Sequence, residues 1–204
     1  MLCGIVNGFL ADPSLVPAGQ YITMGAYTAY PYSRGSIHIT DKEDPVNGYD
    51  FDAGFLSDER DLEKQIWAYK MTREIARRLP YYTGEVEFGH PKFASDSAAV
   101  LNGDVEGGEV KGNIEYSKQD DKVIEEWIRG NLNTTWHSLG TCRMREKEKG
   151  GVVDKDLNVY GTRALKVVDL SVVPENVGAN TNNTALVVGE KAAVIIAREL
   201  GFEV

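Results

Sequence analysis

The chain has 204 residues, of which 42% are hydrophobic and 26% are charged. This balance excludes a wholly disordered chain, and the length suffices for one large domain or two small ones. With 22 Lys and Arg against 31 Asp and Glu, the formal net charge of -9 argues against nucleic acid or an anionic membrane as the main partner.

Beta structure is predicted in two regions. Residues 20–40 contain two strands around a turn, and the alternation of polar and apolar residues over 36–40 indicates that one face is buried. His38 lies opposite that face without ligands at metal-binding spacing, so we interpret it as a solvated or sheet-packing histidine. Residues 41–56 are rich in turn-forming pairs and are predicted to be a loop. Two further short strands are predicted, at residues 157–160 and 165–169.

Three helices are predicted from apolar periodicity and end signals: residues 57–79, 119–132 and 184–200. Ser57 is the candidate N-cap of the first helix, which stops at Pro80, and core packing accounts for its Trp67 and Met71. Residues 80–115 show little periodicity and are interpreted as a long surface excursion or a partly mobile segment. The third helix is so apolar that we expect it to be buried.

No motif for a metal site is present. The two cysteines, Cys3 and Cys142, lie far apart and form no CxxC or metal-finger pattern. We therefore interpret them as free thiols in a reducing compartment and predict no metal. No apolar run approaches the length of a membrane-spanning helix.

Two polar segments carry the clearest signals for chemistry. Residues 133–144 place His137 among small polar residues and glycine, where a base can meet a ligand. Residues 167–184 run from Asp169, at the end of a buried strand, through several asparagines into the last helix, whose N-terminus favours an electron-rich ligand group. The simpler alternative for the second segment is helix capping. The candidates for that cap are Asn182, Asn183 and Thr184.

Together these segments resemble the C-terminal region of the glucose–methanol–choline (GMC) oxidoreductases, and most closely their alcohol (methanol) oxidase branch. The resemblance rests on Trp136-His-Ser-Leu-Gly-Thr-Cys-Arg-Met144, on Leu157-Asn-Val-Tyr-Gly161, on the stretch 165–174 and on Asn180-Thr181. Tyr30-Pro-Tyr-Ser-Arg-Gly35 resembles a strand turn in the substrate domain of the same family. The similar region covers roughly residues 20–202, nearly the whole chain.

The resemblance implies flavin chemistry with FAD as the cofactor. In this family the alcohol carbon passes a hydride to the flavin, a histidine takes the hydroxyl proton, and oxygen reoxidises the flavin to give hydrogen peroxide. His137 matches the histidine, and Asn180 matches the partner that donates to the alcohol oxygen. Asp169, Asn180 and Thr181 match the loop that approaches the flavin. Trp136, beside the base, is a candidate wall of a small substrate pocket, with plain packing as the alternative.

The resemblance also predicts the architecture, an α+β fold (α/β for the whole enzyme). Residues 1–154 would form a GMC-type substrate-binding domain, with residues 20–40 in its sheet and the first two helices flanking it. Residues 155–204 would return to the FAD-binding domain. No two glycines lie two residues apart, so the dinucleotide fingerprint GxGxxG is absent. We therefore expect a C-terminal third that lacks the N-terminal dinucleotide-binding half and leaves apolar surface uncovered.

Three functions are compatible with this resemblance. The first is part of an FAD-dependent alcohol oxidase that uses a small primary alcohol and O2. The second is a non-catalytic fragment, a pseudoenzyme or interaction module, and the third is a GMC dehydrogenase of the aryl-alcohol or choline type. The expected protein partner is a second copy of the full enzyme or the missing N-terminal half. The family default location is the peroxisome, with the cytoplasm as the alternative because the final Gly-Phe-Glu-Val is not a peroxisomal address.

Overall fold

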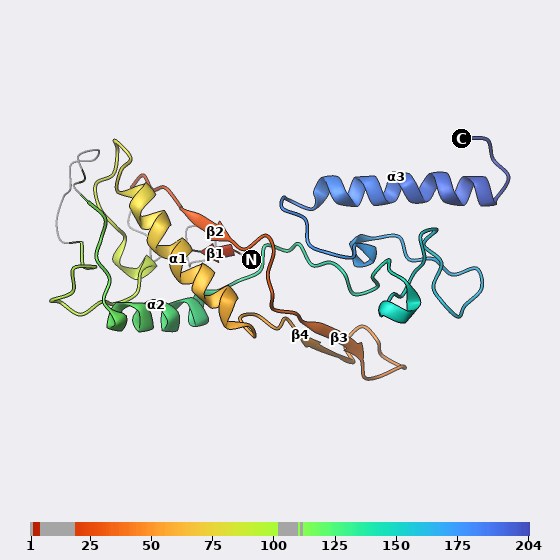
Figure 1. Ribbon diagram of the computed structural model, residues 1–204, viewed down its shortest axis with the longest axis horizontal. Helices are drawn as coiled ribbons and strands as arrows, with labels where there is room; N and C mark the ends of the chain where they lie inside the picture. Colours follow the sequence, from red (N-terminus) through yellow and green to blue (C-terminus); the bar gives the residue numbers. More distant parts are fainter. Residues whose placement is uncertain (1, 5–18, 102–109, 111) are drawn as a thin grey trace. The chain divides into compact units, whose positions relative to one another are not determined.

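The computed structural model describes residues 2–4, 19–101, 110 and 112–204, and its contacts group the chain into two compact units (Figure 1). Unit 1 comprises Met1–Thr28 and Phe55–Thr135, and unit 2 comprises Ala29–Gly54 and Trp136–Val204. The predicted domain boundary at residue 154 lies inside unit 2. It stays a prediction, because contacts within this chain do not define the domains of a larger enzyme.

Unit 1 consists of a small sheet and two α-helices. Strand β1 (Leu2–Gly4) pairs antiparallel with β2 (Gly25–Tyr27), with Leu2 opposite Tyr27. Helix α1 (Glu59–Ala76) contacts β2 and also α2 (Lys118–Asn131). Between the helices, the one regular element among the described residues is the 3-10 helix η2 (Glu87–Gly89). This agrees with the irregular excursion predicted over 80–115, of which residues 102–109 and 111 lie outside the described part of the chain.

The helix ends follow local hydrogen bonding. The Asp58 side chain accepts from the Arg60 backbone N–H and begins α1, so the predicted N-cap Ser57 is wrong by one residue; both residue types cap well. Helix α1 ends at Ala76 rather than at residue 79. At the start of α2, Ser117 Oγ accepts from the Asp120 N–H, and the Asp120 carboxylate accepts from the Ser117 N–H. The predicted second helix is confirmed to within one residue at each end.

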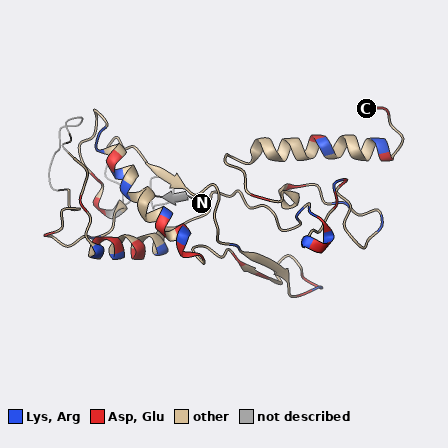
Figure 2. Ribbon diagram, viewed as in Figure 1, with Lys and Arg blue, Asp and Glu red and all other residues tan. Residues whose placement is uncertain are grey.

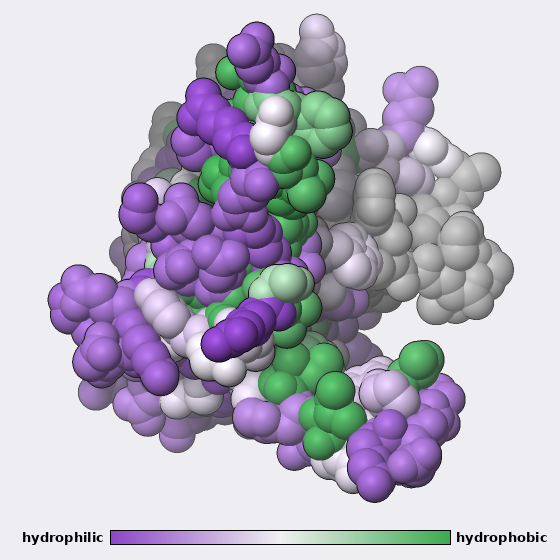
Figure 3. Space-filling model, turned by 90° about the vertical axis from the view of Figure 1, so that its right-hand side faces the viewer, coloured by the Kyte–Doolittle hydropathy of each residue, from purple (hydrophilic) through white to green (hydrophobic). Residues whose placement is uncertain are grey.

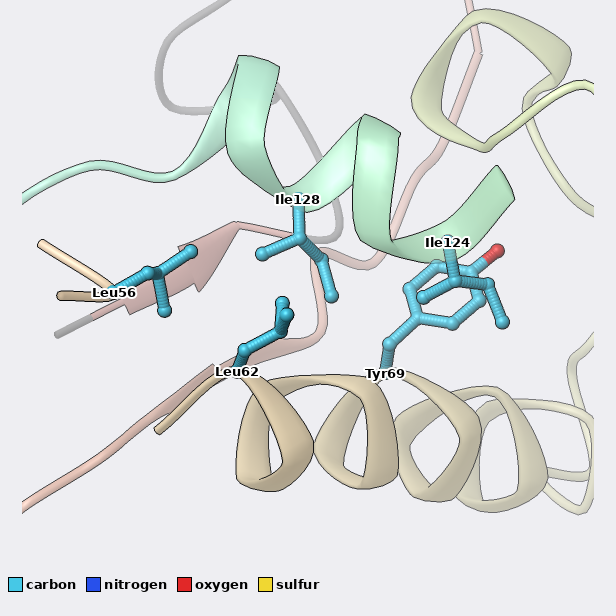
Figure 4. Packing of buried hydrophobic residues seen from close by; sticks show 5 residues of the cluster. All are labelled: Leu56, Leu62, Tyr69, Ile124 and Ile128. Carbon is cyan, nitrogen blue, oxygen red and sulfur yellow. The ribbon is translucent and has the colours of Figure 1, made fainter. Parts of the chain in front are cut away.

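The apolar core of unit 1 lies between α1 and α2 (Figure 4). Its buried members are Leu56, Leu62, Tyr69, Ile124 and Ile128. Trp67 and Met71, which were expected in the core, are 63% and 38% exposed. At 100° per residue they lie on the side of α1 away from Leu62 and Tyr69, so the expectation of core packing is wrong.

A buried charged network sits beside this core. Arg73 is 2% exposed and forms two hydrogen bonds of 2.7 Å with the Glu85 carboxylate. Two further N–H groups donate to Tyr116 Oη at 3.0 Å and to the Ala99 carbonyl at 2.9 Å. Burial alone lowers the pKa of Arg73, but the hydrogen bond and charge of Glu85 more than offset this, so the net shift is upward. Arg73 therefore stays charged in the interior.

Unit 2 begins with a two-stranded antiparallel sheet, β3 (Ser36–Ile39) and β4 (Tyr49–Asp52). Strand β4 falls in the segment predicted to be a loop, so that prediction is wrong. All residues of both strands are exposed, and among the described residues β3 pairs with β4 alone. The predicted burial of one face of residues 36–40 is therefore wrong too. The expected single sheet over residues 20–40 is instead divided between β2 in unit 1 and β3 in unit 2.

The remainder of unit 2 is held by short backbone bridges, two 3-10 helices and a long final helix. These are η3 (Lys147–Lys149), η4 (Leu170–Val172) and α3 (Asn182–Glu199). The predicted strands at 157–160 and 165–169 appear only as isolated bridges: Asn158 lies opposite Lys166, and Val159 lies opposite Val153. A second core gathers residues of the bridges, η4 and α3: Val153, Leu157, Val172 and Ala192.

Helix α3 presents much of its apolar surface to solvent. Only Ala192 is buried, whereas Leu186 and Val187 are 60% and 67% exposed. Charged residues recur along α1 and α2, but most of α3 is uncharged (Figure 2). Hydrophobic side chains reach the surface between hydrophilic ones (Figure 3). The predicted burial of α3 is thus wrong within this chain, and the expected uncovered apolar surface is present.

Candidate active site

Three side chains meet at the start of α3. Asn180 Nδ2 lies 3.0 Å from His137 Nε2, and Thr181 Oγ1 lies 3.0 Å from His137 Nδ1. All three residues belong to unit 2. Both ring nitrogens of His137 are therefore engaged by residues 43 and 44 positions further along the chain.

Backbone hydrogen bonds hold the segment that carries His137. Gly140 N–H donates to the Leu170 carbonyl, and Met144 N–H donates to the Val172 carbonyl, so the segment runs along η4. Gly140 has φ +81°, a conformation that favours glycine, and a Cβ there would lie 3.2 Å from the Val173 carbonyl oxygen. The glycine thus permits the turn that follows the histidine.

The loop before α3 is anchored at several points. Asn176 Nδ2 donates to the Ala29 carbonyl at 3.0 Å, and the Glu175 carboxylate accepts from Arg145 at 2.6 Å. Gly178 lies against the Tyr30 ring, where an added Cβ would be 2.6 Å from the hydroxyl oxygen. These contacts restrain the residues that lead to Asn180.

The orientation of the Asn180 amide follows from its second contact. Its Oδ1 accepts from the Asn182 backbone N–H at 2.9 Å, which leaves the NH₂ group facing His137. An amide NH₂ only donates, so His137 Nε2 accepts and carries a lone pair. The imidazole of this arrangement holds its proton on Nδ1, toward Thr181. The site therefore combines an unprotonated ring nitrogen with an adjacent hydrogen-bond donor.

The side chains differ in burial. Thr181 is 5% exposed, His137 is half-buried, and Asn180 is exposed. A ligand can therefore approach from the side of Asn180 while Thr181 supports the ring from within.

The capping alternative is wrong for Asn182, Asn183 and Thr184, because Thr181 occupies the N-cap position of α3.

The other two predicted site residues are Asp169 and Trp136. Asp169 caps η4, and its Oδ1 accepts from the Ser171 N–H at 2.7 Å. Among the described residues, no hydrogen bond links its carboxylate to His137. Trp136 is 65% exposed and has φ +57°, in the left-handed region. Its candidate role in a pocket and that of Asp169 beside the flavin stay predictions.

Sequence reasoning missed the contact of Thr181 with His137 and the anchors of the loop before Asn180. Asn176 belongs to the asparagine cluster noted in the sequence, but nothing local indicates that it reaches Ala29. Among the described residues no group of three or more His, Cys, Asp or Glu side chains could hold a metal ion. The helices in the described part of the chain are also too short or too polar to cross a membrane.

Comparison with known proteins gives consistent matches. The sequence profile of the GMC oxidoreductase family matches residues 31–189. Alcohol oxidase 1 of Komagataella phaffii is 43% identical over 97% of this chain and 36% of that protein. Alcohol oxidase of Candida boidinii is 38% identical over 97% of this chain and 37% of that protein. The chain thus spans about a third of the length of these relatives.

Solved structures support the same assignment. A fungal aryl-alcohol oxidase superposes with a TM-score of 0.64 at 29% identity, covering 90% of this chain and 26% of that one. An Aspergillus oryzae formate oxidase variant, studied for modification of its FAD, superposes with a TM-score of 0.64. At 21% identity this second match shows the fold alone. The predicted mixture of helices and sheets is thereby confirmed, and the chain belongs to the GMC oxidoreductase family.

Proposed function

We propose that this chain is the proton-handling C-terminal part of an FAD-dependent alcohol oxidase. The whole enzyme would oxidise a primary alcohol to an aldehyde and reduce O2 to hydrogen peroxide. The observation that carries this proposal is the 3.0 Å contact between His137 Nε2 and the amide Nδ2 of Asn180, whose Oδ1 is engaged by the Asn182 N–H. The alcohol oxidases among the relatives support the substrate class.

The two side chains can divide the work on an alcohol. An alcohol hydroxyl between them would donate its hydrogen to His137 Nε2 while its oxygen accepts from Asn180 Nδ2. Two new hydrogen bonds would then replace the single one that joins the residues in the free protein. As the carbon loses its hydride, His137 takes the hydroxyl proton as a general base. The NH₂ group of Asn180 stabilises the negative charge that develops on the oxygen, and as a donor it does not compete for the proton.

Residues of the chain fit one side of FAD. Asn180 Oδ1 accepts from the N–H of Asn182, the first residue of α3, but the Thr181 side chain forms no hydrogen bond to the helix backbone. The rest of the first turn can therefore face an electron-rich ring edge. Asp169 is the other candidate contact. FAD, when bound, accepts the hydride of the alcohol carbon and passes the electrons to O2. The GxGxxG cradle for its diphosphate is absent from these 204 residues, so other residues would have to hold that part.

Anaerobic reduction of the flavin tests the proposal. In the flavin-loaded protein that contains this chain, His137→Ala should abolish reduction by alcohol and leave the flavin bound. The matched control is His38→Ala, because His38 lies in the same unit on the exposed strand β3. Methanol and benzyl alcohol as substrates separate the alcohol oxidase from the aryl-alcohol type. Unchanged reduction in His137→Ala would remove the base assignment.

The isolated 204-residue chain is expected to hold no flavin after purification. Binding through one edge of the cofactor forfeits the interactions of the diphosphate and most of the affinity. Visible absorbance measures this directly, and a yellow protein with about one flavin per chain would contradict it. Peroxisomal location and assembly into homo-oligomers stay predictions from the family resemblance.

A further inference from the structure

We infer that Thr181 is a positioning residue whose hydroxyl holds the His137 imidazole in the tautomer that presents a lone pair on Nε2. The contact that carries the inference is the 3.0 Å distance between Thr181 Oγ1 and His137 Nδ1. The inference rests on the proposed function, because it matters for catalysis only if His137 Nε2 is the base.

The Thr181 hydroxyl is not used by the helix that it precedes. An N-cap threonine ordinarily accepts from a backbone N–H in the first turn. Here the Thr181 backbone has φ -83° and ψ -3°, in the helical region, and its side chain makes no capping bond. The N–H of Asn182, the first helical residue, is served by Asn180 Oδ1 instead. The threonine oxygen is therefore left for His137.

The two neighbours of the ring enforce the same proton position. Asn180 presents a donor to Nε2, so that nitrogen must accept. A neutral imidazole carries one N–H, which then lies on Nδ1 and donates to Thr181 Oγ1. The opposite tautomer would set the Nε2 hydrogen against the Asn180 NH₂ group. It would also leave the exposed face of the site without a base.

The burial of Thr181 makes its hydrogen bond to His137 hard to replace. With 5% exposure, Thr181 leaves little room for water to replace its oxygen beside Nδ1. Removing the hydroxyl would leave the Nδ1–H without an acceptor, and an unsatisfied buried donor is costly. The lost hydrogen bond should therefore shift the tautomer ratio and free the ring to turn.

Nuclear magnetic resonance of the full chain tests the inference without flavin. The chain has three histidines, so nitrogen-15 labelling of histidine gives few signals, and His137→Gln identifies the one from His137. Long-range proton–nitrogen correlations at a pH where the rings are neutral show which nitrogen carries the hydrogen. The comparison uses Thr181→Val, which removes the hydroxyl at nearly constant shape, and Thr181→Ser, which keeps it. Thr184→Val, in the first turn of the same helix, is the matched control.

We expect the Nδ1–H tautomer in the native chain, in Thr181→Ser and in the control. In Thr181→Val the ratio of the Nδ1–H to the Nε2–H form should fall about tenfold, the effect of losing one hydrogen bond. An Nε2–H tautomer in the native chain, or an unchanged ratio in Thr181→Val, would overturn the inference. If Thr181→Val does not fold, the tautomer measured in the native chain decides the test.

A second measurement separates this inference from the proposed function. In the flavin-loaded protein, Thr181→Val should slow flavin reduction about tenfold with little change in the alcohol concentration for half-saturation, and Thr181→Ser should restore the rate. If the tautomer shifts but no variant supports reduction by alcohol, the proposed function fails and the role of Thr181 stands. If reduction is normal and the tautomer does not respond, only the inference about Thr181 fails.

Discussion

The Arg73–Glu85 pair offers the sharpest test of how unit 1 is stabilised. Glu85→Gln removes the negative charge and keeps the shape of the side chain. In the native pair both hydrogen bonds measure 2.7 Å. Glutamine retains one acceptor for Arg73 but sets its NH₂ group against the second guanidinium N–H. Since Arg73 is 2% exposed, its charge then lacks a partner in the interior. Breaking a buried pair in this way costs about 3 kcal/mol or more.

Urea unfolding monitored by tryptophan fluorescence measures this loss. Trp127 packs on Tyr69 with ring centroids 5.9 Å apart, whereas Trp67 and Trp136 are largely exposed, so the signal reports mainly on unit 1. With a slope of about 2 kcal/mol per molar urea, the midpoint should fall by about 1.5 M. The control is Glu125→Gln on α2, whose pair with Arg129 is half-exposed and worth under about 0.5 kcal/mol. Equal small losses in both variants would refute the argument that burial gives the first pair its strength.

Three further predictions concern packing and pH. Ile128→Ala should lower the free energy of unfolding by about 2–5 kcal/mol in urea titrations, because its side chain is fully buried; Ile75→Ala, 46% exposed, should cost far less. Burial lowers the pKa of His90 below 6.5, opposed by the Glu85 carboxylate and aided by the Arg73 guanidinium. As the pH falls, the unfolded chain therefore binds this proton before the folded chain does. The free energy of unfolding should then fall by up to about 1.4 kcal/mol per pH unit below about pH 6.5. His90→Gln should flatten this pH dependence, measured as the urea midpoint at each pH. Gly178→Ala should lower the melting temperature of the chain through its clash with the Tyr30 hydroxyl, and Tyr30→Phe should recover part of the loss; no recovery would contradict the clash.

The elements that could be predicted from the sequence are those whose signals are local. Helix α2 could be predicted from its apolar spacing and its acidic first turn. The hydrogen bonds between Ser117 and Asp120 cap its N-terminus. Strand β4 could not be predicted, because Tyr49–Asp52 becomes a strand only through pairing with β3. The prediction that α3 is buried was wrong for a related reason: the sequence of a helix shows that it is apolar, but not what packs against it.

The candidate site divides in the same way. His137 and Asn180 could be proposed together from the family resemblance, and the structure places them 3.0 Å apart across 43 residues. The role of Thr181 could not, because a threonine before a helix ordinarily caps it, and here a helical backbone conformation turns its oxygen elsewhere. The support from Tyr30 and Asn176 depends on contacts between distant parts of the chain.

The double contact of Asn180 couples the start of a helix to the polarity of a base. One end of the amide receives the N–H of Asn182, and the other end dictates where the imidazole proton resides. An aspartate at this position would preserve the turn, yet it would offer an acceptor where the asparagine offers a donor. The ring would then have to place a hydrogen on Nε2, and the nitrogen that faces the alcohol would no longer be able to take one. A single exchange of NH₂ for oxygen would thus leave the backbone intact and reverse the direction in which protons can move.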